Sequence, residues 1–190
     1  LIKMLKGIPI AKLSEKQRAW LLNVSKNYKL DNEFIDNETF VELLKRVDYV
    51  PPSLALTQAA IESGWGASRF SKQGNNLFGQ WCFSRGCGMV PSSRDSDKAH
   101  EVAKFKTVNN SVRSYILNLN SHDSYAELRQ KRALLREKQA SFTGITLATS
   151  LTEYSEEGKD YVTKVTKFIN HNNLQRFTTE FERSLMVITD

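Results

Sequence analysis

Apolar residues recur at helical spacing along most of the chain. Two segments show the spacing i, i+3, i+4, i+7 that places side chains on one face of an α-helix. These residues are Phe40, Leu43, Leu44 and Val47 in the first segment, and Val112, Tyr115, Ile116 and Leu119 in the second. Ser14 and Gln17 resemble a capping box, which predicts a helix that begins there and reaches about Tyr28. Further helices are expected at about 123–138, 144–151 and 159–170, so the pattern predicts a mainly helical protein.

One predicted helix differs from the others because it carries no charge. The segment Leu54–Ile61 contains no Asp, Glu, Lys or Arg, so we expect it to be buried on most of its sides. Glu62 follows at its C-terminal end, and Gly64 and Gly66 then allow the backbone to turn. The sequence therefore predicts a carboxyl group at the end of a buried helix.

Residues 80–107 have a different composition from the helical segments. Turn-forming residues are frequent there, namely Gly86, Gly88, Pro91, Ser92 and Ser93. The alternating stretch Val102–Phe105 follows them. This composition predicts a small, irregular β-hairpin lobe. The expected fold class is therefore mainly α, a helical bundle with a small β-hairpin lobe beside a cleft.

Composition and charge narrow the class of protein. The chain has 190 residues, of which 40% are hydrophobic and 25% charged, as in ordinary globular domains. No apolar run approaches the ~18 residues of a transmembrane helix, so no integral membrane segment is expected. The net charge is +6, and the densest basic cluster lies at 129–138. This cluster is either a solvated helix face or a surface that attracts a polyanion. No nucleic-acid-binding motif accompanies it, so nucleic acid is not an expected partner.

The cysteines and histidines predict neither a metal site nor a cofactor. Cys82 and Cys87 enclose four residues and either close a small disulfide loop or remain reduced thiols. A single C-x4-C pair without a second Cys or His pair is a poor zinc signal. The three histidines are scattered and make no ligand spacing. We therefore expect a metal-free protein.

The environment predicted for Glu62 suits acid catalysis. Partly apolar surroundings disfavour an ionised carboxyl group and raise its pKa, and the negative end of the helix dipole acts in the same direction. A Glu that stays protonated near neutral pH can act as a general acid for glycosidic cleavage. The alternative is a Glu that only caps or salt-bridges a helix end. Trp65 and its flanking glycines favour the catalytic interpretation, because aromatic faces stack on sugar rings.

Two motifs carry a resemblance to a known family. Ala60–Ser68 reads AIESGWGAS and Asn75–Gly79 reads NNLFG. Together they resemble the motifs of glucosaminidase-type peptidoglycan hydrolases, glycoside hydrolase family 73, which share a lysozyme-like fold with lytic transglycosylases. The leader Arg46–Gly66 is most similar to the bacterial Bax-like branch. The resemblance implies a lysozyme-like glucosaminidase domain at 46–170, with a helical N-terminal extension packed on it at 1–45 and a C-terminal tail at 171–190.

The resemblance also implies roles for individual residues. Glu62 matches the catalytic acid of the family. Tyr154 matches a tyrosine that faces this acid, and the segment that follows Tyr154 departs from the family pattern. The expected substrate-binding residues are Trp65, Asn76, Phe78, Gly79 and Tyr161.

A second catalytic group is less well defined by the sequence. In the family such a carboxylate, when present, lies on the β lobe. The candidates are Asp95, Asp97 and Glu101, and Glu101 is favoured because it leads into the predicted strand. As an alternative, the 2-acetamido oxygen of the substrate attacks the anomeric carbon, and no protein base is needed.

The expected function is hydrolysis of β-1,4 bonds in the glycan strands of peptidoglycan. Because peptidoglycan lies outside the cytoplasmic membrane, the expected location is the periplasm or cell envelope. The alternatives are a lytic transglycosylase, a muramidase, or a non-catalytic module that binds cell-wall glycans. A nucleic-acid-binding module, which depends on net charge alone, is the least favoured.

Overall fold

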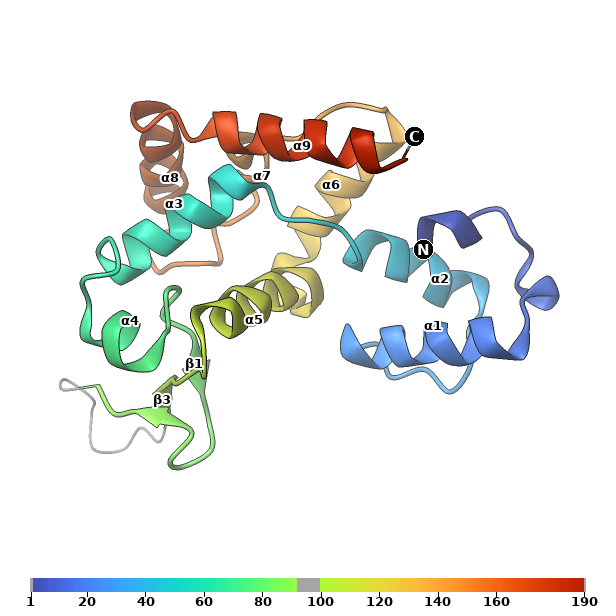
Figure 1. The fold of residues 1–190 in the computed structure, drawn as a ribbon, viewed down its shortest axis with the longest axis horizontal. Helices are drawn as coiled ribbons and strands as arrows, with labels where there is room; N and C mark the ends of the chain where they lie inside the picture. The colour runs from blue at the N-terminus through green and yellow to red at the C-terminus, as the bar shows by residue number, and fades with distance from the viewer. Residues whose placement is uncertain (1, 92–99, 190) are drawn as a thin grey trace.

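The chain forms a mainly helical fold with one small sheet (Figure 1). The structure is a computed structural model that describes residues 2–91 and 100–189. The helices are α1 (Glu15–Asn27), α2 (Asn37–Arg46), α3 (Pro52–Ser63), α4 (Arg69–Gly74), α5 (Val108–Ser121), α6 (Ala126–Glu137), α7 (Gly144–Ala148), α8 (Lys159–His171) and α9 (Gln175–Thr189). Short 3₁₀ turns occupy Ile2–Leu5, Ile10–Lys12 and Asp123–Tyr125. None of the described helices is both long and apolar enough to cross a bilayer.

The β lobe is a three-stranded antiparallel sheet. Its strands are β1 (Trp81–Cys82), β2 (Gly88–Met89) and β3 (Glu101–Ala103), in the order β1-β3-β2. β1 and β2 therefore do not pair with each other, and each pairs with β3. The predicted fold class, mainly α and lysozyme-like with a small β lobe, is confirmed.

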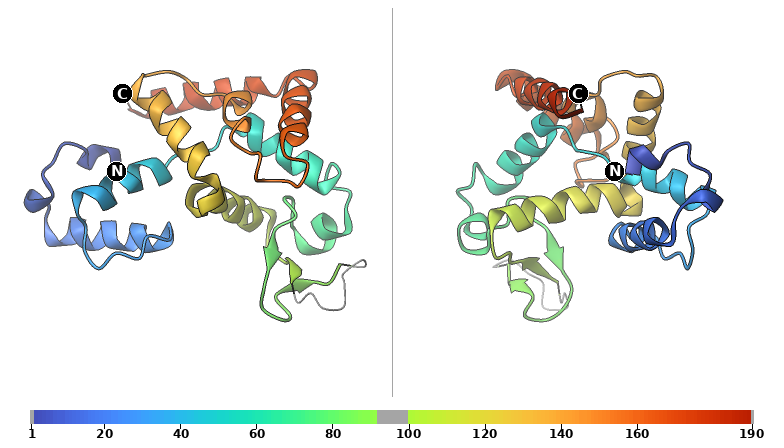
Figure 2. Two further views of the ribbon diagram at one scale, coloured as in Figure 1. Left: turned by 180° about the vertical axis from the view of Figure 1, so that it is seen from behind. Right: turned by 45° about the vertical axis from the view of Figure 1, so that its right-hand side comes forward.

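Side chains pack into two hydrophobic clusters. The main core joins α3, α5, α6, α7 and α8, with Leu54, Leu119 and Leu147 fully buried in it. A smaller N-terminal core forms around α1 and α2, where Leu21 and Leu43 are fully buried. Figures 1 and 2 show α1 and α2 on one side of the molecule, away from the β lobe. The N-terminal helices thus have apolar contacts of their own.

Helix α3 lies at the centre of the main body and packs against α7, α8 and α9. Pro52 stands at its first position, where the missing N–H costs no helical hydrogen bond. Gly64 ends the helix with φ +57°, a left-handed conformation that glycine adopts readily. The predicted uncharged helix therefore delivers Glu62 in its last turn.

The last segment of the chain is helical and anchored to the N-terminal end of α3. The Ser53 amide donates to Thr178 Oγ1 at 3.1 Å, and the Thr178 hydroxyl donates to Ser53 Oγ at 2.8 Å. Both residues are fully buried. Tyr49 adds a hydrogen bond from its hydroxyl to Glu182, at 2.5 Å. Residues 171–190, expected as a tail, thus hold a helix with buried polar contacts to the body.

Two arginines of the basic cluster 129–138 are structural. Arg129 is 3% exposed and Arg132 is 1% exposed, so neither belongs to a solvated face or attracts a polyanion. The acceptors are carbonyl oxygens near helix ends: Leu119 and His122 for Arg129, and Lys45 and Tyr49 for Arg132. The last carbonyls of a helix lack intrahelical partners, and a cation is favourable there. Both interpretations made from the sequence are therefore wrong for these two residues.

Candidate active site

The Glu62 carboxyl group lies in the wall of a cavity of about 620 Å³ between α3, α5 and the β lobe. Aromatic side chains supply much of the wall among the described residues, namely Phe78, Trp81, Phe83, Tyr125 and Tyr154. Polar groups of α5, including Ser114 and Asn118, lie among them. Aromatic faces beside hydrogen-bonding groups suit a ligand with apolar ring faces and many hydroxyl groups, as a sugar has.

Glu62 is half-buried, and this burial raises the pKa of its carboxyl group. A hydrogen bond from Tyr161 and the charge of Lys164 oppose the effect, and Glu157 adds to it. Because burial is the largest of these influences, the neutral acid is favoured more strongly than in a solvated Glu. The expectation from the sequence named the same physical cause.

Buried side chains next to Glu62 form a chain of hydrogen bonds in which each group donates to the next and the last donates to Glu62. The Tyr115 hydroxyl donates to Gln58 Oε1 at 2.6 Å, and Gln58 Nε2 donates to the Tyr161 hydroxyl oxygen at 3.0 Å. The Tyr161 hydroxyl then donates to Glu62 Oε1 at 2.8 Å. Since Tyr161 already accepts from an amide N–H, its own proton goes to Glu62. In the neutral acid, Oε1 is thus the acceptor and the transferable proton belongs on Oε2.

The sequence pattern did not identify Gln58 and Tyr115 as functional residues, although the position of Gln58 could have indicated its role. Gln58 stands four residues before Glu62 and so shares its face of α3. A polar amide inside an uncharged, buried helix needs partners, and Gln58 is fully buried. Tyr115 was assigned to the apolar stripe of its helix, and nothing local identifies its hydroxyl as a donor to Gln58.

Both predicted tyrosines lie near the acid, in different roles. Tyr161 is 1% exposed and contacts Glu62 directly through its hydroxyl. Tyr154 lines the cavity and stacks on Tyr161, with ring centroids 5.4 Å apart. Tyr154 also lies beside Tyr125, at 6.0 Å between ring centroids. The tyrosine bonded to Glu62 is therefore Tyr161, whereas Tyr154 lines the cavity.

The NNLFG loop reaches the cavity through Phe78 and Gly79. Phe78 stacks on Tyr115 at 3.9 Å between ring centroids, and Gly79 has φ +62°. Asn76 is buried, and its side chain makes four hydrogen bonds, all to backbone groups of residues 78, 80 and 103. These bonds use every donor and both acceptor positions of the amide, so Asn76 shapes the loop and ties it to β3.

Glu101 lies in the β lobe and is not among the residues that line the Glu62 cavity. It is 5% exposed, and its two carboxylate oxygens accept from the amides of Gly86 and Gly88 at 3.0 and 2.8 Å. The disulfide between Cys82 and Cys87 closes the same loop, which answers the question that the sequence left open. The other candidates, Asp95 and Asp97, lie outside the described residues.

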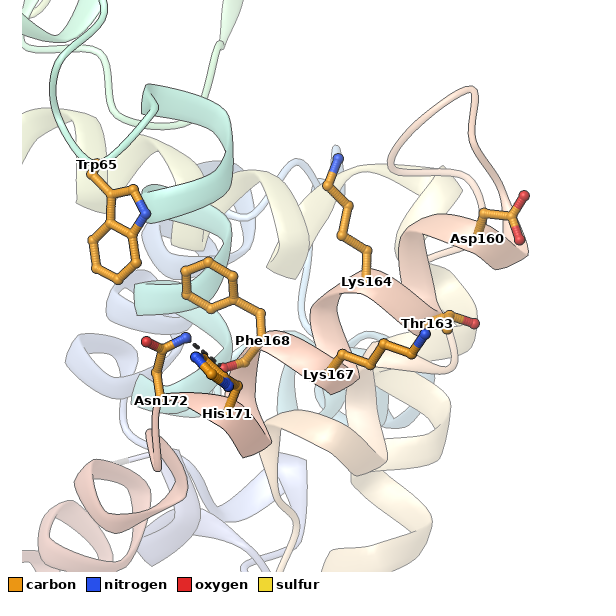
Figure 3. Close-up of a pocket in the computed structure, with 8 residues that line it drawn as sticks. All are labelled: Trp65, Asp160, Thr163, Lys164, Lys167, Phe168, His171 and Asn172. Carbon is orange, nitrogen blue, oxygen red and sulfur yellow. Dashed lines mark hydrogen bonds between the residues drawn. The ribbon is translucent and has the colours of Figure 1, made fainter.

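The side chain of Trp65, just after the end of α3, does not face the cavity that Glu62 lines. Its side chain is 70% exposed and packs against Phe168 of α8, with ring centroids 5.2 Å apart. It lines an open groove along α8 and is not part of the Glu62 cavity wall (Figure 3). The structure thus brings Glu62, Phe78, Gly79 and Tyr154 together and places Trp65 apart.

A half-buried acid that faces an aromatic cavity in a lysozyme-like fold is typical of a glycoside hydrolase. The family model described as "Glucosaminidase: Mannosyl-glycoprotein endo-beta-N-acetylglucosaminidase" matches residues 37–174. This match covers most of the chain, which therefore belongs to the glucosaminidase family of glycoside hydrolases. The resemblance inferred from the motifs is confirmed.

Two curated proteins are similar to the chain. "Protein bax" of Escherichia coli (strain K12) is 36% identical over 151 residues, which cover 78% of the chain and 53% of that protein. "Exo-glucosaminidase LytG" of Bacillus subtilis (strain 168) is 31% identical over 96 residues, covering 50% of the chain and 33% of LytG. The chain thus spans about half the length of the first relative and a third of the second. No solved structure gives a significant match.

The hydrogen bond from Tyr161 leads to a prediction about pH dependence. Replacing Tyr161 by Phe removes a donor that stabilises the ionised form of Glu62, so the pKa of Glu62 rises further. A general acid works only while protonated, and activity falls as the pH passes its pKa. The alkaline limb of the pH–rate profile will therefore move to higher pH. We also expect kcat/KM at its maximum to fall roughly 10- to 100-fold, since a hydrogen bond to a charged group is worth about 1.5–3 kcal/mol.

The matched comparison is Tyr154→Phe, which removes the same atom from the stacked ring. Tyr154 lines the cavity, and the tyrosine hydroxyl bonded to Glu62 is that of Tyr161. The alkaline limb of the pH–rate profile of Tyr154→Phe should therefore stay where it is in the wild type. The measurement is kcat/KM as a function of pH. If the alkaline limb of Tyr161→Phe coincides with that of the wild type, the Tyr161 hydroxyl does not influence the pKa of Glu62.

Proposed function

We propose that the protein is a peptidoglycan hydrolase that cleaves β-1,4 bonds between N-acetylated sugars, with Glu62 as the general acid. One observation carries this proposal. The acid stands in the wall of an aromatic cavity, burial raises its pKa, and Tyr161 holds its Oε1 atom. Its Oε2 atom is then the one that gives its proton to the oxygen linking two sugars.

The similarity to LytG supports a glucosaminidase specificity, since that relative is named an exo-glucosaminidase. The motifs that resemble cell-wall hydrolases support peptidoglycan as the substrate. Location outside the cytoplasmic membrane follows from that substrate. The Cys82–Cys87 disulfide is in accord with it, because disulfides persist in oxidising compartments.

The catalytic step begins when Glu62 protonates the glycosidic oxygen as the bond from this oxygen to the anomeric carbon breaks. The positive charge that develops on the sugar then needs a nucleophile. Among the described residues, Glu62 supplies the sole carboxyl group in the cavity wall. We therefore favour attack by the substrate's own acetamido oxygen, followed by water, over a water molecule activated by Glu101. In an inverting mechanism with Glu101 as base, azide would restore activity to Glu101→Ala and give the inverted glycosyl azide.

The products released from purified cell walls test the proposal. Mass spectrometry of the soluble fragments should show an N-acetylglucosamine reducing end that has gained one water. A fragment lighter by one water, with a 1,6-anhydro ring, would indicate a lytic transglycosylase. An N-acetylmuramic acid reducing end would indicate a muramidase, and walls that bind the protein without releasing fragments would indicate a non-catalytic module.

A further inference from the structure

A second groove, with a volume of about 750 Å³, lies along the outer face of α8 (Figure 3). Trp65 and one stripe of α8 line it, and members of the stripe repeat at three- and four-residue intervals. The stripe consists of Asp160, Thr163, Lys164, Lys167, Phe168 and His171. At 1.5 Å per residue, the stripe is roughly 16 Å long. This face borders the buried face of α8, which carries Tyr161, Val165 and Ile169 into the main core.

The conformation of Trp65 is costly for the fold. Its φ is +58°, and its neighbours Gly64 and Gly66 are also left-handed, at +57° and +75°. Glycine or asparagine adopts such a backbone with less strain than a bulky aromatic residue does. The ring is also 70% exposed, so its burial returns little stability. Strained residues of this kind cluster at ligand-binding sites, which points to a binding role for the indole.

One lysine of the same stripe has no ion-pair partner among the described residues. Lys164 is paired with Glu157 at 3.2 Å, whereas Lys167 forms no ion pair within the described part of the chain. Lys167 precedes Phe168 directly, and Figure 3 shows its side chain extending along the helix away from the two aromatic rings, toward Thr163. Asp160 lies at the opposite end of the stripe from these rings. The groove therefore offers an aromatic platform and an available ammonium group.

We propose that this groove binds a muramoyl unit that carries its acidic peptide, with the sugar ring against Trp65 and Phe168 and the peptide carboxylates near Lys167. The assignment rests on the proposed function, since it takes peptidoglycan as the substrate. A chain of N-acetylglucosamine alone has no charge for a lysine to recognise. The peptide attached to a muramoyl unit supplies carboxylates, which are complementary to Lys167.

The position of the groove connects it with the cleavage site. Glu62 and Trp65 are three residues apart at the end of α3, yet one faces the aromatic cavity and the other faces the groove. Tyr161, which bonds to Glu62, and Lys164 are one turn apart on α8. A glycan strand that occupies both places would pass the end of α3, where Glu62 lies in the cavity wall. The groove would select strands that still carry peptides.

The test is an NMR titration of the protein with N-acetylmuramoyl-tetrapeptide, which contains no β-1,4 bond to cleave. The Trp65 indole N–H signal, assigned by its loss in Trp65→Asn, should shift on addition of this probe. Lys167→Glu should weaken binding by roughly 5- to 10-fold, and the effect should shrink at high salt. Lys159→Glu is the matched control, because Lys159 begins the same helix, is exposed and does not line the groove. It should bind like the wild type, and uncharged N-acetylglucosamine should not distinguish Lys167→Glu from the wild type.

Two results would overturn the assignment. In one, Lys167→Glu and Lys159→Glu weaken binding equally. In the other, the Trp65 indole N–H signal does not shift when the muramoyl peptide is added. A signal that shifts with a polyglycerol phosphate but not with the muramoyl peptide counts as this second result. Failure of this assignment can be told apart from failure of the proposed function. A protein that releases wall fragments while its indole signal stays still contradicts the groove alone, and one that binds the probe without cleaving walls contradicts the hydrolase alone.

Discussion

Replacing Glu62 by Gln will lower the hydrolysis of purified cell walls by about 10²–10⁴-fold, the range for loss of a general acid. Glutamine has nearly the same size, and its amide oxygen can still accept the hydrogen bond from Tyr161. It has no proton to give to the glycosidic oxygen. The melting temperature should therefore stay close to that of the wild type, and the loss should appear in kcat more than in KM.

The matched control for this variant is Glu153→Gln. Glu153 is exposed, lies next to Tyr154 in sequence and does not line the cavity. The same chemical change there should leave the rate of wall clearing, measured by turbidity, as it is in the wild type. If Glu62→Gln also clears walls at the wild-type rate, another group supplies the proton and the proposed mechanism is wrong.

Replacing Arg132 by Met will destabilise the fold by about 2–4 kcal/mol, since two partly buried carbonyl oxygens lose their donors. The guanidinium donates to Tyr49 at 3.0 Å and to Lys45 at 2.8 Å, near the end of α2. Burial lowers the pKa of Arg132 to about 10, so the side chain is still protonated at neutral pH. Removing a buried charge relieves its desolvation penalty, which keeps the expected loss moderate.

Thermal unfolding measures this effect. For a chain of this size, a loss of 2–4 kcal/mol lowers Tm by roughly 5–15 °C. Arg113→Met is the matched control, because Arg113 is exposed on α5 and the same substitution there should change Tm little. Equal melting of Arg132→Met and the wild type would mean that the carbonyls find other donors and that Arg132 is dispensable for the joint between α2 and α6.

The helices and the position of Glu62 could be predicted because their signals are local. A capping box marks the start of α1, as expected from Ser14 and Gln17. The uncharged run before Glu62 and the left-handed Gly64 after it fix where α3 ends. Apolar periodicity and turn residues act over a few positions, so they can be recognised without knowledge of the tertiary fold.

The partners of the acid could not be predicted in the same way. Tyr161 is 99 residues from Glu62 and 103 from Gln58, so only the packing of α8 on α3 brings them together. Trp65 is the opposite case, in which neighbours in sequence lie in different pockets. Its closeness to Glu62 in sequence suggested a shared cleft, but the left-handed turn after α3 directs the ring to the α8 groove.

Charge alone also gave a poor guide to burial. Arg129 and Arg132 belong to a segment rich in Arg and Lys, which normally indicates an exposed basic surface, yet both side chains are buried. Their burial depends on carbonyl oxygens at the ends of two other helices, which no local pattern describes. For Glu101, the acidic side chain has two backbone N–H donors from a loop more than ten residues away.

Lys29, just beyond the end of α1, lines the Glu62 cavity although it precedes the family match that begins at residue 37. One border of the cavity is therefore built by a segment that the matched family domain does not include. Variation in that segment can change how many sugars fit on this side of the acid without altering Glu62, Tyr161 or the hydrogen bonds behind them. This border can therefore diverge in sequence while the acid and its hydrogen-bonded partners stay the same.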